Sequence, residues 1–302
     1  MPNQTLTQSL SPAKTWRGPA PILVASVLWG STGTAASFAP DGTPAAAIGS
    51  AGLALGGLLL FASTRGNRLK CTRSERWLLL LGACAVAGYP VTFYPAVARS
   101  GVAVATVIAL GSAPVFAGLL SWITGHGRPT ARWVLATMVA VTGCAVLVLG
   151  PEISGGARPV DLVGIALAAC GGLAYAVYSL VGGKLIARGH ASGTVMGSMF
   201  GMAAVLVLPV VLGAGIGWLV TPRGAAVALH LAVFTTFIAY TLFGYGLRHT
   251  GIATATTLTL TESAVAAVLG VVVVGERLPL MSWCGMAVLA AALVLLTVPT
   301  RE

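Results

Sequence analysis

The chain has 302 residues, of which 57% are hydrophobic and only 8% are charged, and its mean hydropathy is +0.92. Because ordinary water-soluble domains contain roughly a quarter charged residues, this composition excludes a fold that is solvated over its whole surface. A membrane-spanning helix needs roughly 20 apolar residues, so the length allows about ten spans with short connections. We therefore expect a protein embedded in a lipid bilayer, with no extramembrane domain.

The formal net charge of +10 results from 17 Lys and Arg residues against seven acids. In a soluble protein such a balance would suggest a nucleic-acid partner. Here the basic residues occupy short gaps between apolar runs, as in cytoplasmic loops, which are enriched in Lys and Arg. We therefore expect no nucleic-acid partner. The densest group is Arg65, Arg68, Lys70, Arg73 and Arg76.

Ten apolar runs are predicted to be membrane spans, and they cover residues 19–38, 43–63, 75–97, 102–123, 130–150, 160–185, 191–215, 222–247, 252–274 and 280–298. With the N-terminus inside, thirteen Lys and Arg lie at cytoplasmic span ends and four at external ends. This bias follows the rule for orientation in membranes. It predicts a multi-pass protein of the inner (plasma) membrane with both termini in the cytoplasm.

The two halves of the sequence are similar to each other. Residues 100–106 read SGVAVAT, and residues 250–256, an offset of 150, read TGIATAT. The same offset pairs Pro129 with Pro279 and Trp133 with Trp283. Because each copy holds an odd number of spans, the copies enter the membrane from opposite sides, as in many secondary transporters.

The predicted fold is therefore an all-α polytopic membrane protein of ten transmembrane helices, arranged as two inverted-topology five-helix repeats. The expected units are a cytoplasmic N-terminal tail (1–18), the first repeat (19–150), the second repeat (151–298) and a cytoplasmic C-terminal tail (299–302). Close helix packing is expected at three pairs of glycines with GxxxG spacing. These pairs are Gly52 with Gly56, Gly197 with Gly201, and Gly213 with Gly217.

Several short motifs occur in a fixed order along the chain. Residues 28–32 read LWGST, 112–117 read SAPVFA, 175–178 read YAVY, and 261–263 read TES before GERL at 275–278. Together they resemble segments of the EamA-type ten-helix exporters of the drug/metabolite transporter superfamily. The chain departs from that pattern at Ser263, where the family usually has proline, and at residues 125–128, which read GHGR instead of GER. The resemblance implies export of amino acids, metabolites or drugs by alternating access.

Glu262 is the only acid that lies well inside a predicted span, because Glu75 and Asp161 lie at the ends of theirs. An ionised carboxylate at mid-membrane costs on the order of 3 kcal/mol or more, so a proton, a bound partner or a watery cavity is expected there. Glu262 is thus a candidate for proton coupling, and the alternative is a packing role as a neutral acid. Its mate at the 150-residue offset is Ser112, a candidate substrate-binding residue. His230, inside the eighth span, is the second candidate for proton coupling, although a histidine satisfied by a neighbour is the favoured interpretation.

Aromatic side chains gather in the first, third, sixth and eighth predicted spans. Buried Tyr and Trp need hydrogen-bond partners, which an amphipathic amine or amino acid in a cavity would supply. Core packing explains them equally well. The substrate-binding candidates in this group are Trp29, Tyr89, Tyr94, Tyr175, Tyr178, Tyr240 and Tyr245.

Among classes of function, an intramembrane enzyme is disfavoured because the sequence has no HExxH, GxSxG or P-loop motif and no second acid near Glu262. A secondary exporter of small amphipathic metabolites is favoured, and a facilitative uniporter or channel-like permease is the alternative. We expect a small-molecule substrate and neither a cofactor nor a metal. The sequence leaves homodimer formation open.

Overall fold

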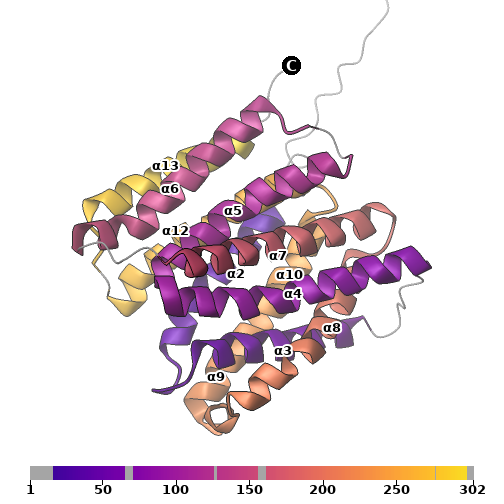
Figure 1. Cartoon of the computed structure of the whole chain (residues 1–302), viewed down its shortest axis with the longest axis horizontal. Helices are drawn as coiled ribbons and strands as arrows, with labels where there is room; N and C mark the ends of the chain where they lie inside the picture. Colours follow the sequence, from indigo (N-terminus) through magenta and orange to yellow (C-terminus); the bar gives the residue numbers. More distant parts are fainter. Residues whose placement is uncertain (1–15, 65–70, 126–127, 156–160, 276, 298–302) are drawn as a thin grey trace, which may run out of the picture.

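The computed structural model describes residues 16–64, 71–125, 128–155, 161–275 and 277–297. Within these ranges every regular element is a helix (Figure 1). Helices are expected in lipid because they satisfy their own backbone hydrogen bonds. Outside the described residues lie most of the N-terminal tail, the whole C-terminal tail, residues 65–70 of the basic loop and Glu276 of the GERL motif.

The first seven helices each coincide with one predicted span. They are α2 (Pro19–Ser37), α3 (Ala45–Ser63), α4 (Arg73–Ser100), α5 (Val102–Ile123), α6 (Ala131–Gly155), α7 (Leu162–Ala187) and α8 (Ser192–Gly213). The last predicted span coincides with α13 (Leu280–Thr297). Helix α5 follows α4 after one residue, Gly101, whose φ of +83° suits glycine because it has no Cβ.

The eighth and ninth predicted spans contain interruptions that the apolar pattern did not predict. After the short 3-10 helix η1 (Gly217–Val220), the eighth consists of α9 (Pro222–His230), the π-helix η2 (Leu231–Ile238) and α10 (Ala239–Gly246). The ninth consists of α11 (Ile252–Leu258), α12 (Thr261–Leu269) and the π-helix η3 (Gly270–Val274). Such π-helical turns inside helices are frequent at functional sites.

Eight helical stretches of the described chain are long and apolar enough to cross a membrane, judged by length and composition. The first of these stretches begins at Ala45 and the last ends at Val274. Helix α2 is not among them, and α13 is classed as a shorter apolar helix. The prediction of a polytopic α-helical membrane protein is therefore confirmed. The number of ten crossings and the inverted orientation of the repeats stay predictions.

Small residues let several helices approach closely. A Cβ at Gly197 of α8 would lie 2.7 Å from the carbonyl oxygen of Leu60 in α3, and one at Gly285 of α13 would lie 2.7 Å from the carbonyl oxygen of Gly143 in α6. Figure 1 shows α6 and α13 side by side. The predicted contact at Gly213 and Gly217 is wrong, because α8 ends at Gly213 and a Cβ at either position would meet no described atom within 4 Å.

Helices α4 and α7 pack along their lengths and are joined by ion pairs at both ends. At one end Arg99 Nε lies 3.1 Å from Asp161 Oδ2. Asp161 also caps α7 by accepting a hydrogen bond from the backbone N–H of Gly164 at 2.9 Å. This backbone N–H and the Arg99 guanidinium lower the pKa of Asp161 below its usual range.

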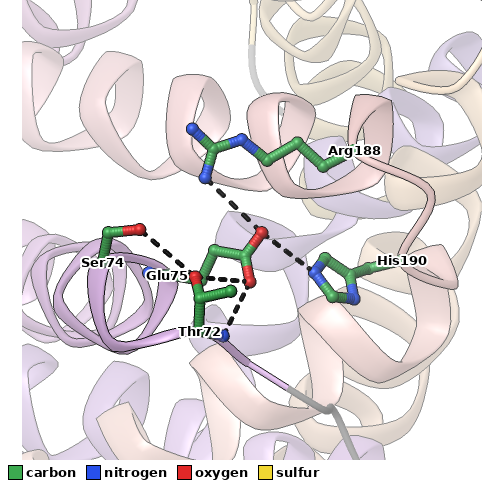
Figure 2. Close-up of polar contacts among 5 residues, drawn as sticks. All are labelled: Thr72, Ser74, Glu75, Arg188 and His190. Carbon is green, nitrogen blue, oxygen red and sulfur yellow. Dashed lines mark hydrogen bonds and ion pairs between the residues drawn. The ribbon is translucent and has the colours of Figure 1, made fainter.

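At the other end of the same helix pair, Glu75 Oε1 lies 3.5 Å from Arg188 Nη1 and 3.3 Å from His190 Nε2 (Figure 2). Glu75 also completes a capping box with Thr72, the residue that precedes α4. Its second carboxylate oxygen accepts a hydrogen bond from the Thr72 backbone N–H at 2.9 Å. One carboxylate thus caps α4 and connects it to the turn between α7 and α8.

Candidate functional site

Six aromatic rings from four helices form one contiguous cluster. Trp29 of α2 lies 4.9 Å from Tyr240 of α10 between ring centroids, and Phe200 of α8 lies 4.0 Å from the same tyrosine. Tyr178 and Tyr175 of α7 lie 5.1 Å apart, and Phe243 contacts Trp29 at 5.4 Å. The structure therefore brings together four of the seven predicted aromatic residues.

The polar side-chain atoms of this cluster all make hydrogen bonds within the protein. The indole N–H of Trp29 donates to the backbone carbonyl of Thr235 at 2.8 Å, within the π-helix η2. The hydroxyl of Tyr178 lies 3.0 Å from that of Tyr240, and the hydroxyl of Tyr175 donates to Thr259 Oγ1 at 3.0 Å. These rings therefore form a core whose polar atoms are already hydrogen-bonded, next to the interrupted spans.

Two further tyrosines come from α4 and are only half-buried. Tyr89 stacks on Phe93 with centroids 5.4 Å apart, and Phe93 contacts Tyr94 edge-on at 5.9 Å. The Tyr94 hydroxyl lies against Gly49 of α3, where a Cβ would overlap it. Within the described part of the chain, neither hydroxyl has a hydrogen-bond partner. Both can therefore bind a ligand without breaking a protein hydrogen bond.

Glu262 lies in the first turn of α12, directly after the interruption between α11 and α12. Its side chain is half-buried, and its carboxylate makes no hydrogen bond to another described residue. It is close enough to Tyr89, Tyr175 and Tyr240 to interact with them electrostatically. A helix N-terminus also favours negative charge. The arrangement is a carboxylate that forms no ion pair with a described residue and interacts electrostatically with tyrosines from three helices.

The neighbouring helix α2 packs tightly against the backbone of this segment. A Cβ at Gly30 would lie 2.6 Å from the Cβ of Val265 and 2.9 Å from the carbonyl oxygen of Glu262. Gly30 belongs to the LWGST motif, and Trp29 precedes it. The motif therefore supplies both the indole that contacts η2 and the small residue against which α12 lies.

The remaining predicted residues make other contacts. His230 ends α9, is half-buried, and contacts Ser31 Oγ through Nε2 at 2.8 Å. Ser112 is half-buried, donates to the Ala109 carbonyl at 3.3 Å, and packs against α7. Tyr245 is 41% exposed and its ring contacts His249, so it does not join the aromatic cluster.

Several residues near Glu262 were not predicted from the sequence. Thr259 accepts a hydrogen bond from the Tyr175 hydroxyl. Cys144 of α6 donates to Ser263 Oγ at 3.3 Å, and the hydroxyls of Thr137 and Thr257 are hydrogen-bonded. The available signal was the threonine-rich stretch TATTLTLT at 254–261. Threonine side chains can bond the backbone of their own helix and compete with regular helical bonding. Among the described residues, no group of three His, Cys, Asp or Glu side chains is placed to hold a metal ion.

The helices and this centre define a polytopic α-helical membrane protein with a carboxylate among tyrosines. The model of the EamA-like transporter family matches residues 16–149 and again residues 162–298. The chain therefore belongs to the EamA-like transporter family, within the drug/metabolite transporter superfamily, and its general function is transport.

Curated relatives cover nearly the whole chain. It is 33% identical to the uncharacterized transporter YwfM of Bacillus subtilis over 282 residues, which cover 93% of this chain and 94% of that protein. It is 28% identical to the threonine/homoserine exporter RhtA of Escherichia coli K12 over 285 residues, covering 93% and 90%. The RhtA of Salmonella typhimurium LT2 is 29% identical over 265 residues, covering 85% and 84%.

A solved crystal structure has a similar fold. It superposes with a TM-score of 0.77 and covers 92% of this chain and 95% of its own, at 19% sequence identity. This likeness concerns the fold alone.

Proposed function

We propose that this protein is a secondary transporter that exports small amphipathic metabolites, namely amino acids or related amines, by alternating access with proton coupling. The observation that carries the proposal is the setting of Glu262, a half-buried carboxylate with no hydrogen bond to a described neighbour. Because an uncompensated charge in a membrane is costly, its charge is balanced by a proton or by a cationic group of the substrate. Competition of the two for one carboxylate couples their movements.

The names of the relatives support the substrate class. RhtA is named for threonine and homoserine, and an amino acid carries an ammonium group that suits the Glu262 carboxylate. Tyr89 and Tyr94 offer ring faces and hydroxyls with no hydrogen-bond partner among the described residues. A cation over an aromatic face gains about 0.5 to 2 kcal/mol. On this proposal Glu262 binds the amine, and the two tyrosines bind the rest of the molecule.

Two observations support a protein of two inverted halves. The same family model matches the chain twice, at 16–149 and 162–298. In addition, α4 and α5 pack on α7, while η2, α10 and α12 pack on α2, which is the same arrangement with the halves exchanged. Alternating access is then a rocking of the halves around a site between them.

The proposed orientation places both termini in the cytoplasm of an inner-membrane protein. Its support is the excess of Lys and Arg at one set of span ends, thirteen against four. A reporter fused to residue 1 and one fused to residue 302 should both be located in the cytoplasm. A reporter inserted after Glu152 should be located outside the cell. Opposite locations for the two termini would contradict the ten-span arrangement.

The transport proposal is tested in proteoliposomes that contain the purified chain. Radiolabelled threonine and homoserine, each tested separately, should accumulate above equilibrium when a pH gradient is imposed. A facilitative uniporter or channel would only equilibrate them, and a chemically altered product would reveal an enzyme. The homodimer left open by the sequence is tested on the same preparation by its mass in detergent.

A further inference from the structure

The position of the Glu262 carboxylate is set by the backbone that carries it. Its side chain makes no hydrogen bond to a described neighbour, so no such bond holds the carboxylate in place. The backbone before it is not regular helix, because α11 ends at Leu258 and α12 begins at Thr261. At this interruption Glu262 N–H bonds the Thr259 carbonyl at 3.0 Å, a bond of i to i−3 type. Whatever fixes the interruption therefore fixes the carboxylate.

Three side-chain hydrogen bonds connect the interrupted span to the neighbouring helices α6 and α7. Each places a polar atom of the span against a partner that is distant in sequence. The pairs are Thr257 with Thr137 at 3.0 Å, Thr259 with Tyr175 at 3.0 Å, and Ser263 with Cys144 at 3.3 Å.

Of the three bonds, only that between Tyr175 and Thr259 acts on the interruption itself. Thr259 accepts from the Tyr175 hydroxyl and donates in turn to the Thr256 carbonyl at 2.8 Å. Tyr175 is only 5% exposed, and its ring packs against Tyr178 and Phe243 at centroid distances of 5.1 and 6.2 Å. The hydroxyl thus belongs to a buried, packed ring and bonds the interrupted part of the ninth span.

We propose that Tyr175 is a positioning residue: through Thr259, its hydroxyl holds the interruption between α11 and α12 and thereby fixes the Glu262 carboxylate. The consequence for transport rests on the proposed function, in which Glu262 exchanges a proton for substrate. Without the hydroxyl, the segment would leave the observed conformation more often and the carboxylate would be less well placed.

The inference is tested by the reactivity of Glu262 in the purified full-length protein. Dicyclohexylcarbodiimide modifies membrane carboxyl groups, and the adduct at Glu262 is quantified by mass spectrometry at one fixed pH. Tyr175→Phe and Thr259→Val should each raise the initial labelling rate about threefold, the factor of an average hydrogen bond between membrane helices. The double variant should react no faster than either single variant, because both remove the same bond.

Two controls separate positioning from general loosening. Thr259→Ser keeps the hydroxyl and should restore the wild-type rate. Thr137→Val loses a hydrogen bond of the same kind, to Thr257 at 3.0 Å outside the interruption, and should leave Glu262 labelling unchanged.

Wild-type rates in both Tyr175→Phe and Thr259→Val would overturn the inference, as would multiplied effects in the double variant. An equal rise in Thr137→Val would overturn it too. The absence of any Glu262 adduct in every variant would also overturn it. Labelling needs no substrate, so these outcomes are independent of the proposed function, which fails separately if the pH gradient does not drive transport.

Discussion

Glu75 and His190 lie 3.3 Å apart although 115 residues separate them in the sequence, and they connect the start of α4 to the turn between α7 and α8 (Figure 2). Arg188 approaches the same carboxylate oxygen at 3.5 Å. Because α4 belongs to the first family match and α7 to the second, this cluster joins the two parts of the chain. Arg99 and Asp161 join the same two helices at their other ends.

Substituting Glu75 separates its two roles. Glu75→Gln can still complete the capping box with Thr72 but loses both ion pairs, whereas Glu75→Ala loses cap and ion pairs together. In thermal unfolding in detergent, the melting temperature should be highest for the wild type, lower for Glu75→Gln and lowest for Glu75→Ala. Raising the salt concentration should change both differences little, because the Glu75 side chain is only 10% exposed and salt screens buried charge pairs weakly. Equal melting temperatures for Gln and Ala would show that the cap contributes nothing.

Asp161→Asn tests the opposite end of the helix pair. Asparagine still caps a helix, so this variant removes mainly the charge that faces Arg99. The pKa of Asp161 is lowered in the folded protein. Its charge therefore stabilises the folded state at pH values above the usual aspartate pKa of about 3.9. That stabilisation is lost as the pH falls below this value through the lowered pKa. The melting difference from wild type should therefore be full near pH 7 and shrink steadily as the pH is lowered below about 3.9; a constant difference would contradict the ion pair.

Gly30→Ala should disturb the packing of α2 on α12. The added methyl would lie 2.6 Å from Val265 Cβ and 2.9 Å from the Glu262 carbonyl oxygen, and overpacking of this kind costs about 1–3 kcal/mol. Gly33→Ala, on the same helix, is the matched control, because a Cβ there meets nothing within 4 Å. Adding Val265→Ala should recover part of the loss. Equal melting temperatures for the two alanine variants would argue against close contact at Gly30.

The positions of most helices could be predicted from the apolar pattern alone, whereas the interruptions of the eighth and ninth predicted spans could not. The predicted span 102–123 coincides with α5, and 222–247 ends one residue beyond α10. Long apolar runs define helices in lipid because no other open structure satisfies the backbone there. The isolation of Glu262 was likewise visible in the sequence, because it is the only acid away from the ends of the predicted spans.

The hydrogen bonds around the site could not be predicted in the same way. Trp29 bonds a carbonyl 206 residues away, and Tyr175 bonds a hydroxyl 84 residues away. Such partners are determined by which helices pack together, and hydropathy does not encode that choice. Tyr245 shows the converse, since its residue type suggested the site but its direction on α10 places it at the surface.

Trp29→Phe tests whether the indole supports the π-helix η2. Phenylalanine keeps a large ring beside Tyr240 but removes the N–H that bonds the Thr235 carbonyl. The loss should cost about 0.6–1.7 kcal/mol, the range for hydrogen bonds between membrane helices. Hydrogen exchange should rise in residues 231–238 and stay unchanged in α13. Unchanged exchange in η2 would mean that the Trp29 bond contributes nothing to its stability.

The most direct test of the central claim is transport by Glu262→Gln, which keeps the shape of the side chain but cannot ionise. In proteoliposomes the wild type should accumulate threonine or homoserine when a pH gradient is imposed. The Gln variant, at equal protein content, should lose this accumulation and still exchange labelled for unlabelled substrate when no gradient is present. A Gln variant that accumulates substrate with undiminished dependence on the pH gradient would contradict the account.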